Sequence, residues 1–322
     1  MYVASYEQHK TTTPTRHSLI HNILNDYNQI TKIKIAKSLH NHITLIKDNS
    51  DWVVVEKDNF PVEPSQIKKL LWSLQSLTDY EKKTANPKRF SALSLQDLAS
   101  NDQGNYKITI FKKQNNPILD LIIGTQSQFK QLYTVYLRHA DSKQSWKAQS
   151  AKTIALDIFD FIDNNIMNID SQNIQSLTIT PNNGKPYRVL PTKSGNSFYL
   201  QNVPADKQVK SDYEINTYGQ ILSHLMFEDV QSQKRLPTKK PSFNMVAATK
   251  NMNIFLRFFP DATQKDMFWM SCYAKSSSSH ESEGVNKINK KCKGWLFRVP
   301  SWVEKHVNTP KSEHIRNKKK NG

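Results

Sequence analysis

Apolar and polar residues alternate along the first regular block of the chain, residues 30–56, and this is the period of a half-buried β-strand. Three alternating runs are separated by turn-forming stretches at 37–41 and 48–51. We expect this block to form a three-stranded meander with one buried face. A helix should follow, because Ile67, Leu70 and Leu74 recur at helical spacing and Ser65 is suited to cap their start.

The same order of pattern returns in the second half of the chain, with an offset that drifts only from 144 to 148 residues. Self-similarity of this kind is typical of a duplicated supersecondary unit. The matched apolar positions are Ile33, Ile35, Ile43, Leu45, Trp52, Ile67, Leu70, Leu74 and Leu77 in the first half, and Leu177, Ile179, Tyr187, Val189, Phe198, Ile215, Tyr218, Leu222 and Leu225 in the second.

Further strands are expected in both halves, joined by short hairpin connections that favour antiparallel pairing. The expected strands are 106–111, 118–123, 132–138, 243–248, 251–259 and 267–274, with a turn at 124–127. Short strands at Trp146 and at 294–297 precede expected helices at 154–164 and from Ser301, and another helix is expected at 211–227.

The predicted fold class is therefore α+β, built as two tandem repeats of an antiparallel β-meander plus a packed helix, with mostly antiparallel sheets. The predicted organisation is a flexible N-terminal lead-in at 1–24, a first repeat at 25–170, a second repeat at 171–308 and a basic disordered tail at 309–322.

Charge is unevenly distributed along the chain, which has 45 basic and 28 acidic residues and a net charge of +17. Over half of that excess lies in residues 285–322, which carry eleven basic and two acidic side chains. A basic tail can contact anionic lipid or nucleic acid, and it also aids solubility. No apolar run approaches the ~20 residues that span a bilayer, and the first residues do not resemble a signal peptide, so we expect the printed chain to be soluble.

The two cysteines, Cys272 and Cys292, are too few for a disulfide framework or a metal cluster. They can pair with each other if the protein lies outside the cytoplasm, or remain two free thiols. The sequence leaves both alternatives open.

Beyond the periodicity, an ordered series of short motifs resembles the uncharacterised bacterial domain-of-unknown-function family 4340. The series covers roughly residues 25–300, and two of its usual residues are replaced, a glycine by Ser94 and a tryptophan by Phe161. The matching pieces are Trp52-Val53-Val54, Leu70, Leu74, Leu77, Asn86-Pro87-Lys88-Arg89-Phe90, Leu93, Asp97, Gly124, Tyr136, Arg138, Trp146, Asp160-Phe161-Ile162-Asp163, Ile169-Asp170 and the strand 174–179.

The resemblance implies an accessory, extracytoplasmic component of an ABC-transporter system, including the gliding-motility type. Members usually carry a hydrophobic anchor before the first strand, and the printed sequence has none there, so we expect either a different start or a soluble member. The family has no established activity, and no catalytic or cofactor-binding residue is carried over from it.

Candidate chemistry in the chain is weak. His40 and His42 are spaced to share a metal, but no third ligand accompanies them. The stretch 280–283 lacks the second histidine of a zinc-protease helix, and no G-x-S-x-G elbow marks a serine nucleophile.

Two further groups of residues are better explained by structure than by chemistry. The aspartates at 157, 160 and 163 are expected on the solvated side of the helix at 154–164. The aromatic residues Trp52, Trp146, Phe198 and Trp295 fall at matching repeat positions and are expected in the core. We therefore assign no catalytic, cofactor-binding or metal residue, and expect neither a cofactor nor enzymatic activity.

The leading functional hypothesis is a non-enzymatic scaffold of the cell envelope, on the periplasmic side of the inner membrane, that binds a membrane transporter component. A cytoplasmic location is the alternative. The alternative function is a module that binds nucleic acid or anionic lipid through the basic C-terminal segment. The segments that differ between the two halves, 86–97, 275–285 and the basic tail, are where function is expected.

Overall fold

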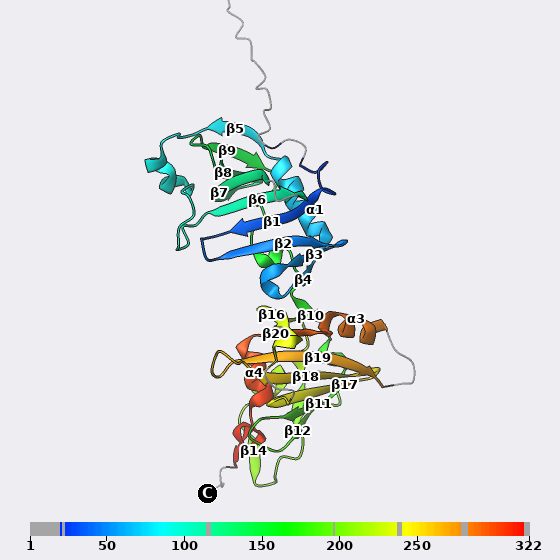
Figure 1. Ribbon diagram of the computed structural model, residues 1–322. Coiled ribbons are helices and arrows are strands. Elements are labelled where there is room, and N and C mark those ends of the chain that lie inside the picture. The colour runs from blue at the N-terminus through cyan, green and yellow to red at the C-terminus, as the bar shows by residue number, and fades with distance from the viewer. Residues whose placement is uncertain are drawn as a thin grey trace, which may run out of the picture. The chain divides into compact units, whose positions relative to one another are not determined.

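The computed structural model describes residues 20, 23–113, 117–195, 197–236, 240–277 and 283–318. The chain divides into two compact units, residues 1–163 and 164–322 (Figure 1), and each is described by itself. Most of the predicted lead-in, residues 1–24, lies outside the described residues. No helix in the described part is long and apolar enough to cross a bilayer.

In its described residues, unit 1 contains one α-helix, three short 3₁₀ helices and nine strands. The helix α1 begins with Pro64 at its first position, where the missing N–H costs nothing, and not after a Ser65 cap. The elements are β1 (Ile30–Ala36), β2 (His42–Asp48), β3 (Asp51–Val54), η1 (Val55–Lys57), β4 (Phe60–Val62), α1 (Pro64–Gln75), β5 (Thr78–Lys82), η2 (Pro87–Leu93), β6 (Tyr106–Lys112), β7 (Pro117–Phe129), β8 (Leu132–His139), β9 (Trp146–Ser150) and η4 (Ile158–Asp160).

In the part that the structure describes, unit 2 contains three α-helices and twelve strands, together with short 3₁₀ helices. Its elements are β10 (Asn165–Met167), η5 (Ser171–Asn173), β11 (Ile174–Thr180), β12 (Tyr187–Pro191), β13 (Phe198–Leu200), β14 (Lys207–Val209), α2 (Asp212–Thr217), η6 (Tyr218–Gln220), β15 (Leu225–Met226), β16 (Asp229–Ser232), η7 (Gln233–Arg235), β17 (Phe243–Thr249), β18 (Met252–Pro260), β19 (Phe268–Ser276), α3 (Glu283–Cys292), β20 (Trp295–Arg298), α4 (Ser301–Asn308), η8 (Lys311–His314) and β21 (Ile315–Asn317).

Each unit is organised around one large sheet, and the strands of both sheets pair antiparallel. The sheet of unit 1 has the order β4-β3-β2-β1-β6-β7-β8-β9-β5, and that of unit 2 has the order β13-β12-β11-β17-β18-β19-β20-β16. The predicted α+β class with mostly antiparallel sheets is thus confirmed. Apart from β4, the two orders correspond strand by strand, with β1 matching β11, β6 matching β17 and β5 matching β16.

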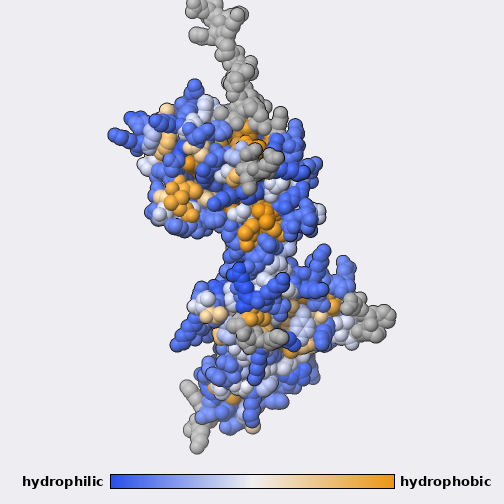
Figure 2. Space-filling view, in the orientation of Figure 1, coloured by the Kyte–Doolittle hydropathy of each residue, from blue (hydrophilic) through white to orange (hydrophobic). Residues whose placement is uncertain are grey.

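The core of each unit lies on one side of its sheet, as the alternating pattern predicts. In unit 1, Ile33 and Leu45 are fully buried together with Leu70 and Leu74 of α1, which lies against the sheet (Figure 1). In unit 2 the inward side chains of β17 and β18 are buried in the same alternating way, and α4 contacts β11 and β17. On the side shown in Figure 2, both units are mostly hydrophilic, with hydrophobic residues in separate patches.

Two of the four aromatic residues that were expected in the core are buried. Trp52 and Phe198 are both buried, as predicted. Trp146 and Trp295 are only half-buried. Both lie next to the end of a sheet, because Trp146 pairs with Lys82 of the outermost strand β5 and Trp295 pairs with Ser232 of the outermost strand β16.

Three predicted elements were wrong in extent. Only the 3₁₀ turn η4 forms within 154–164, and the helix expected at 211–227 ends as α2 at Thr217, continues through η6 and gives way to β15. The turn expected at 124–127 does not exist, because β7 runs unbroken to Phe129 and the chain reverses at Lys130, which has a positive φ. Apolar spacing marks which residues are buried, but short runs do not show where a helix stops.

Candidate functional site

The connection 86–97 of unit 1 is held against the sheet by a single buried arginine, Arg138 of β8. Its Nε donates to Leu95 O at 2.8 Å, and its Nη1 donates to the backbone carbonyls of His139, Ala140 and Ser142 at 3.0–3.2 Å. Its Nη2 pairs with the carboxylate of Asp97. We call this arrangement the Arg138 clamp.

An apolar contact and a close backbone approach complete the Arg138 clamp. The guanidinium lies over the ring of Phe90, and Phe90 packs with Leu95 on Ile122 of β7. The carbonyl of Leu93 sits 2.1 Å from the point where a side chain at Gly124 would begin, so only glycine fits there. Ser94 has φ 52°, a left-handed conformation that glycine adopts more easily, which accounts for the glycine usual in the family.

The Arg138 clamp is structural, because every nitrogen of its guanidinium already has a protein acceptor. A site that binds an anion needs donors that are free to reach the ligand. A hollow of about 400 Å³ lies beside the clamp, lined by Lys34, Asp97 and Lys107 among others, but Asp97 pairs with Arg138 and Lys107 pairs with Asp120 at 3.0 Å. The motifs that carry the family resemblance therefore build a tertiary contact.

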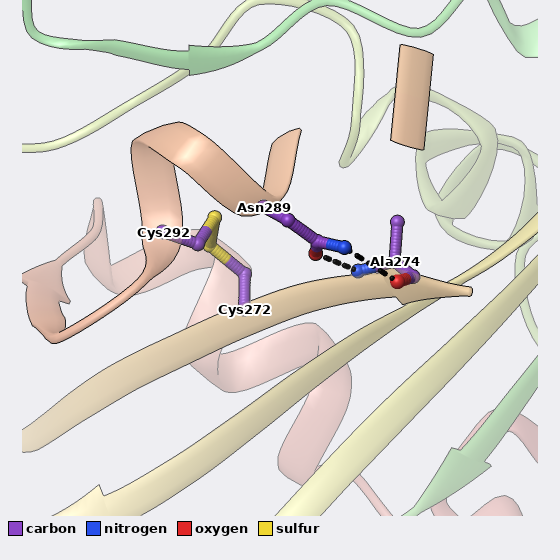
Figure 3. Close-up of a disulfide and its surroundings, with 4 residues drawn as sticks. All are labelled: Cys272, Ala274, Asn289 and Cys292. Carbon is purple, nitrogen blue, oxygen red and sulfur yellow. Dashed lines mark hydrogen bonds between the residues drawn. A yellow bond between two sulfur atoms is a disulfide. The ribbon is translucent and has the colours of Figure 1, made fainter. Parts of the chain in front are cut away.

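The stretch 275–285 leads into a helix that a disulfide fastens to the sheet of unit 2 (Figure 3). Cys272 of β19 and Cys292 of α3 are bonded, with their Cα atoms 5.5 Å apart, which decides the alternative left open by the sequence. Helix α3 buries Val285 and Ile288 and exposes two lysines, Lys287 and Lys290. The positions 278–282, including His280, lie outside the described residues.

Asn289 of α3 binds the edge of β19 as a neighbouring strand would. Its Nδ2 donates to Ala274 O at 3.0 Å and its Oδ1 accepts from Ala274 N at 2.8 Å (Figure 3). In unit 1 the strand β9 pairs with β8 over five residues, whereas β20 pairs with β19 only at Met270. Helix α3 thus satisfies backbone groups that the short β20 leaves unpaired.

A buried polar cluster, which we call the His314 latch, holds the C-terminal segment on unit 2. The hydroxyl groups of Tyr187 and Tyr218 lie 2.8 Å apart, and His314 Nε2 is 2.9 Å from the Tyr218 hydroxyl. Tyr187 also donates to Thr309 O, and His314 Nδ1 lies 3.5 Å from Glu214. Burial raises the pKa of both tyrosine hydroxyls far above its usual range and lowers the pKa of His314.

The segment expected to be a disordered tail, 309–322, is therefore ordered as far as the structure describes it. Residues Ile315–Asn317 form β21, which pairs with β14, and His314 is only 2 % exposed. Lys311 Nζ donates to the backbone carbonyls of Gln201 and Asn202. Residues 319–322 lie outside the described part. A few apolar and hydrogen-bonding residues outweigh the charge pattern here because they find partners far away in the sequence.

Besides the His314 latch, unit 2 contains a second polar cluster around Asp261. Its carboxylate accepts from Thr263 N, from Trp269 Nε1 at 2.7 Å and from Arg298 Nη2 at 2.8 Å. Burial raises the pKa of Asp261, but these hydrogen bonds from Thr263 and Trp269 outweigh it and lower the pKa overall. The group is a stable carboxylate and not a proton donor.

The remaining candidate residues are not brought together. His40 is in a turn and His42 begins β2, where it lies 3.5 Å from Glu56. No group of three or more His, Cys, Asp or Glu in the described ranges is placed to hold a metal ion. Asp157 and Asp160 form a capping box around η4, with Asp160 accepting from two backbone N–H groups at 2.9 Å. They were expected on a helix face and instead stabilise a turn.

Sequence reasoning missed the clusters that the fold assembles. Arg138 stands near the end of an apolar strand, and this position weakly indicates that its side chain is buried. Nothing in the sequence indicated that its partner is Asp97. Tyr187, Tyr218 and His314 are separated by 31 and 96 residues along the chain, and only the packing of β12, η6 and η8 joins them.

The Arg138 clamp predicts that substituting Arg138 destabilises the protein more than substituting Asp97. Arg138→Met removes the side-chain donor to four buried or partly buried carbonyls and should lower the free energy of unfolding by about 3 kcal/mol. Asp97→Asn should cost less than about 1 kcal/mol, because the Asp97 side chain is 85 % exposed and its ion pair is screened. Urea unfolding would measure both losses.

Arg138→Lys is the matched control and should behave like Arg138→Met, since an amine cannot reach the same acceptors. A larger loss for Asp97→Asn would contradict the assignment.

The His314 latch predicts that acid weakens unit 2. Burial lowers the pKa of His314, so the unfolded chain binds its proton near pH ~6.5 while the folded chain stays neutral. The free energy of unfolding should fall as the pH drops below that value, by at most about 1.4 kcal/mol per pH unit.

The slope between pH 8 and 5.5 should be shallower in His314→Gln, as measured by urea unfolding. Glu304 has the opposite sign, because burial raises its pKa to about 7, so both proteins are best compared in a Glu304→Gln background. Equal slopes with and without His314 would refute the assignment.

Comparison with known proteins identifies a family but no function. A family model described as a domain of unknown function, DUF4340, matches residues 52–242. No curated protein and no solved structure matches the chain. The matched range covers more than half of the chain and includes the whole Arg138 clamp. The chain belongs to the DUF4340 family of proteins.

Proposed function

We propose that this protein is a non-enzymatic interaction protein of the cell envelope, built from a duplicated α+β unit, which binds a protein component of a membrane transporter. The observation that carries the proposal is the disulfide between Cys272 and Cys292. Disulfides persist in oxidising compartments and are rare in the cytosol. Here the bond fastens α3 over a strand edge, so it supports the folded structure of unit 2.

The state of the buried polar groups favours binding over catalysis. A catalytic acid, base or nucleophile needs access to a substrate and an unoccupied position beside it. The donors of Arg138 are all used, Asp261 is held by hydrogen bonds, and His314 is buried between two tyrosines. Each of these groups contributes to packing two parts of the chain together.

The corresponding strand orders support the proposed duplication. The register adds to this support, because Ile33 pairs with Leu45 in unit 1 and Leu177 pairs with Val189 in unit 2, with the same offset of 144 residues for both partners. Both meanders are followed by a helix and then by an outer strand, β5 or β16, at the far end of the sheet. The transporter partner is what the family resemblance implies.

The proposed compartment predicts that both cysteines are protected in the living cell. In the native host, maleimide should label Cys272 and Cys292 only after a reductant is added, and the chain should fractionate with the envelope. Crosslinking before membrane extraction should then capture a transporter component with it. The variant Cys272→Ser with Cys292→Ser is the background control for labelling. The proposal would be contradicted if both thiols were free and the chain were found in the cytoplasm without a membrane partner.

A second candidate function, polyanion binding through the basic C-terminal segment, is favoured by one observation on α3. Lys287 and Lys290 are exposed on this disulfide-fastened helix, and the exposed Lys293 directly follows it. Fixed lysines form a more defined positive surface than a tail does. Lys311, in contrast, is used within the fold.

This second candidate predicts salt-dependent binding that depends on α3. Binding of heparin or of anionic vesicles should weaken steeply between low and moderate salt, and Lys287→Gln with Lys290→Gln should lower the affinity about tenfold. Arg316→Gln with Lys318→Gln is the control with the same change in charge. Deleting residues 311–322 is a poor test because it also removes the His314 latch. Binding that is unchanged in the α3 variant would exclude this function.

A further inference from the structure

Part of the outward face of the sheet in unit 2 carries exposed cations, next to Trp269, whose Nε1 donates to the Asp261 carboxylate. We define the cationic face by the outward residues Arg188, Asn244, Phe255, Arg257, Tyr273 and Lys275, which lie on β12, β17, β18 and β19. Arg188, Arg257 and Lys275 are exposed, and no described residue forms an ion pair with any of them. A hollow of about 600 Å³ lies over this face, lined by Asn244, Phe255 and Arg257 and bordered by Lys240.

The corresponding side of unit 1 is partly covered. There β7 occupies the place that β18 occupies in unit 2, and its outward residue Ile122 is buried beneath Phe90 and Leu95 of the Arg138 clamp. On β18 the outward residue Arg257 is exposed to solvent. The two units thus share a strand order but differ in what covers this face.

The aromatic side chains of the cationic face hold its cations in place. Phe255 and Tyr273 are stacked, with their centroids 4.5 Å apart and their planes 3° apart. Arg257 lies over the Tyr273 ring and donates to its hydroxyl at 2.7 Å, and the Lys275 amine is 5.9 Å from both rings. These contacts reduce the side-chain freedom that binding would otherwise remove.

The spacing of the cations requires an extended ligand. The charged groups of Arg257 and Lys275 both lie close to the Tyr273 ring, at 4.8 Å and 5.9 Å from its centroid. Arg188 and Tyr273 share a row that crosses four strand spacings, or ~19 Å. A single small anion cannot meet Arg188 and this pair together, whereas an extended peptide of about seven residues spans the distance.

We propose that the cationic face binds an extended acidic segment of a protein partner, which rests on the proposed function and names the chemistry of that partner. Charge complementarity argues for carboxylates, because the six residues that define the face include three exposed cations and no acidic side chain. Single-stranded nucleic acid would need free ring faces on which its bases could stack. Here Phe255 covers one face of Tyr273, and Arg257 lies over the same ring.

A labelled poly-glutamate peptide of about ten residues, long enough to cross the face, tests the proposal with the full oxidised chain. Fluorescence anisotropy at low salt should show binding that weakens about tenfold or more in Arg257→Gln with Lys275→Gln. The matched control is Lys305→Gln with Arg316→Gln, two exposed basic residues on α4 and β21 outside the cationic face, and it should retain most of the affinity. Thermal unfolding would verify that both variants remain folded.

Three results would overturn the proposal: no binding of the peptide, equal losses in the two double variants, or a single-stranded oligonucleotide that binds the same face more tightly than the peptide. The proposed function fails differently, through free thiols in the cell and the absence of a membrane partner. Peptide binding can therefore fail while the envelope assignment stands, and the reverse is also true.

Discussion

Burial of one face of each antiparallel sheet is the constraint on which the rest of this structure depends. The alternating side chains of β1 and β6 in unit 1, and of β11 and β17 in unit 2, place their apolar atoms on a single side. That side must be covered, and α1 does so in one unit while α4 does so in the other. Once the inward face is covered, the strand order and register follow, because a shift by one residue would turn every apolar side chain outward.

The outward faces are under no such constraint, and there the two units diverge. Unit 1 covers part of its outward side with the connection 86–97, which Arg138 holds through backbone carbonyls. Unit 2 leaves exposed cations and stacked aromatic rings on the equivalent side and uses a disulfide-fastened helix to protect a strand edge. The two units therefore share a strand order while their outer surfaces differ, and function depends on the sites placed on a fold and not on the fold itself.

The hydrophobic periodicity predicted which helices and strands form more reliably than it predicted where they begin and end. The meanders, α1, α4 and the strands of β17–β19 follow from alternation or helical spacing in single stretches of sequence. The helices expected at 154–164 and 211–227 did not form at that length, because a capping box around η4 and the burial of Tyr218 in the His314 latch determine the local backbone there. Composition also gave the wrong expectation for residues 309–318, where pairing of β21 with β14 and the buried His314 order a basic segment.

The sequence by itself determined the α+β class, the buried face of each sheet and membership of a family whose motifs run in a fixed order, since these depend on periodicity and on local spacing. Only the tertiary structure decided that Arg138 is a clamp, that Cys272 and Cys292 are bonded, and that Arg257 and Lys275 share an exposed face. Each of these depends on contacts between residues distant in the chain, and such distances are set by how strands pair and not by any local pattern.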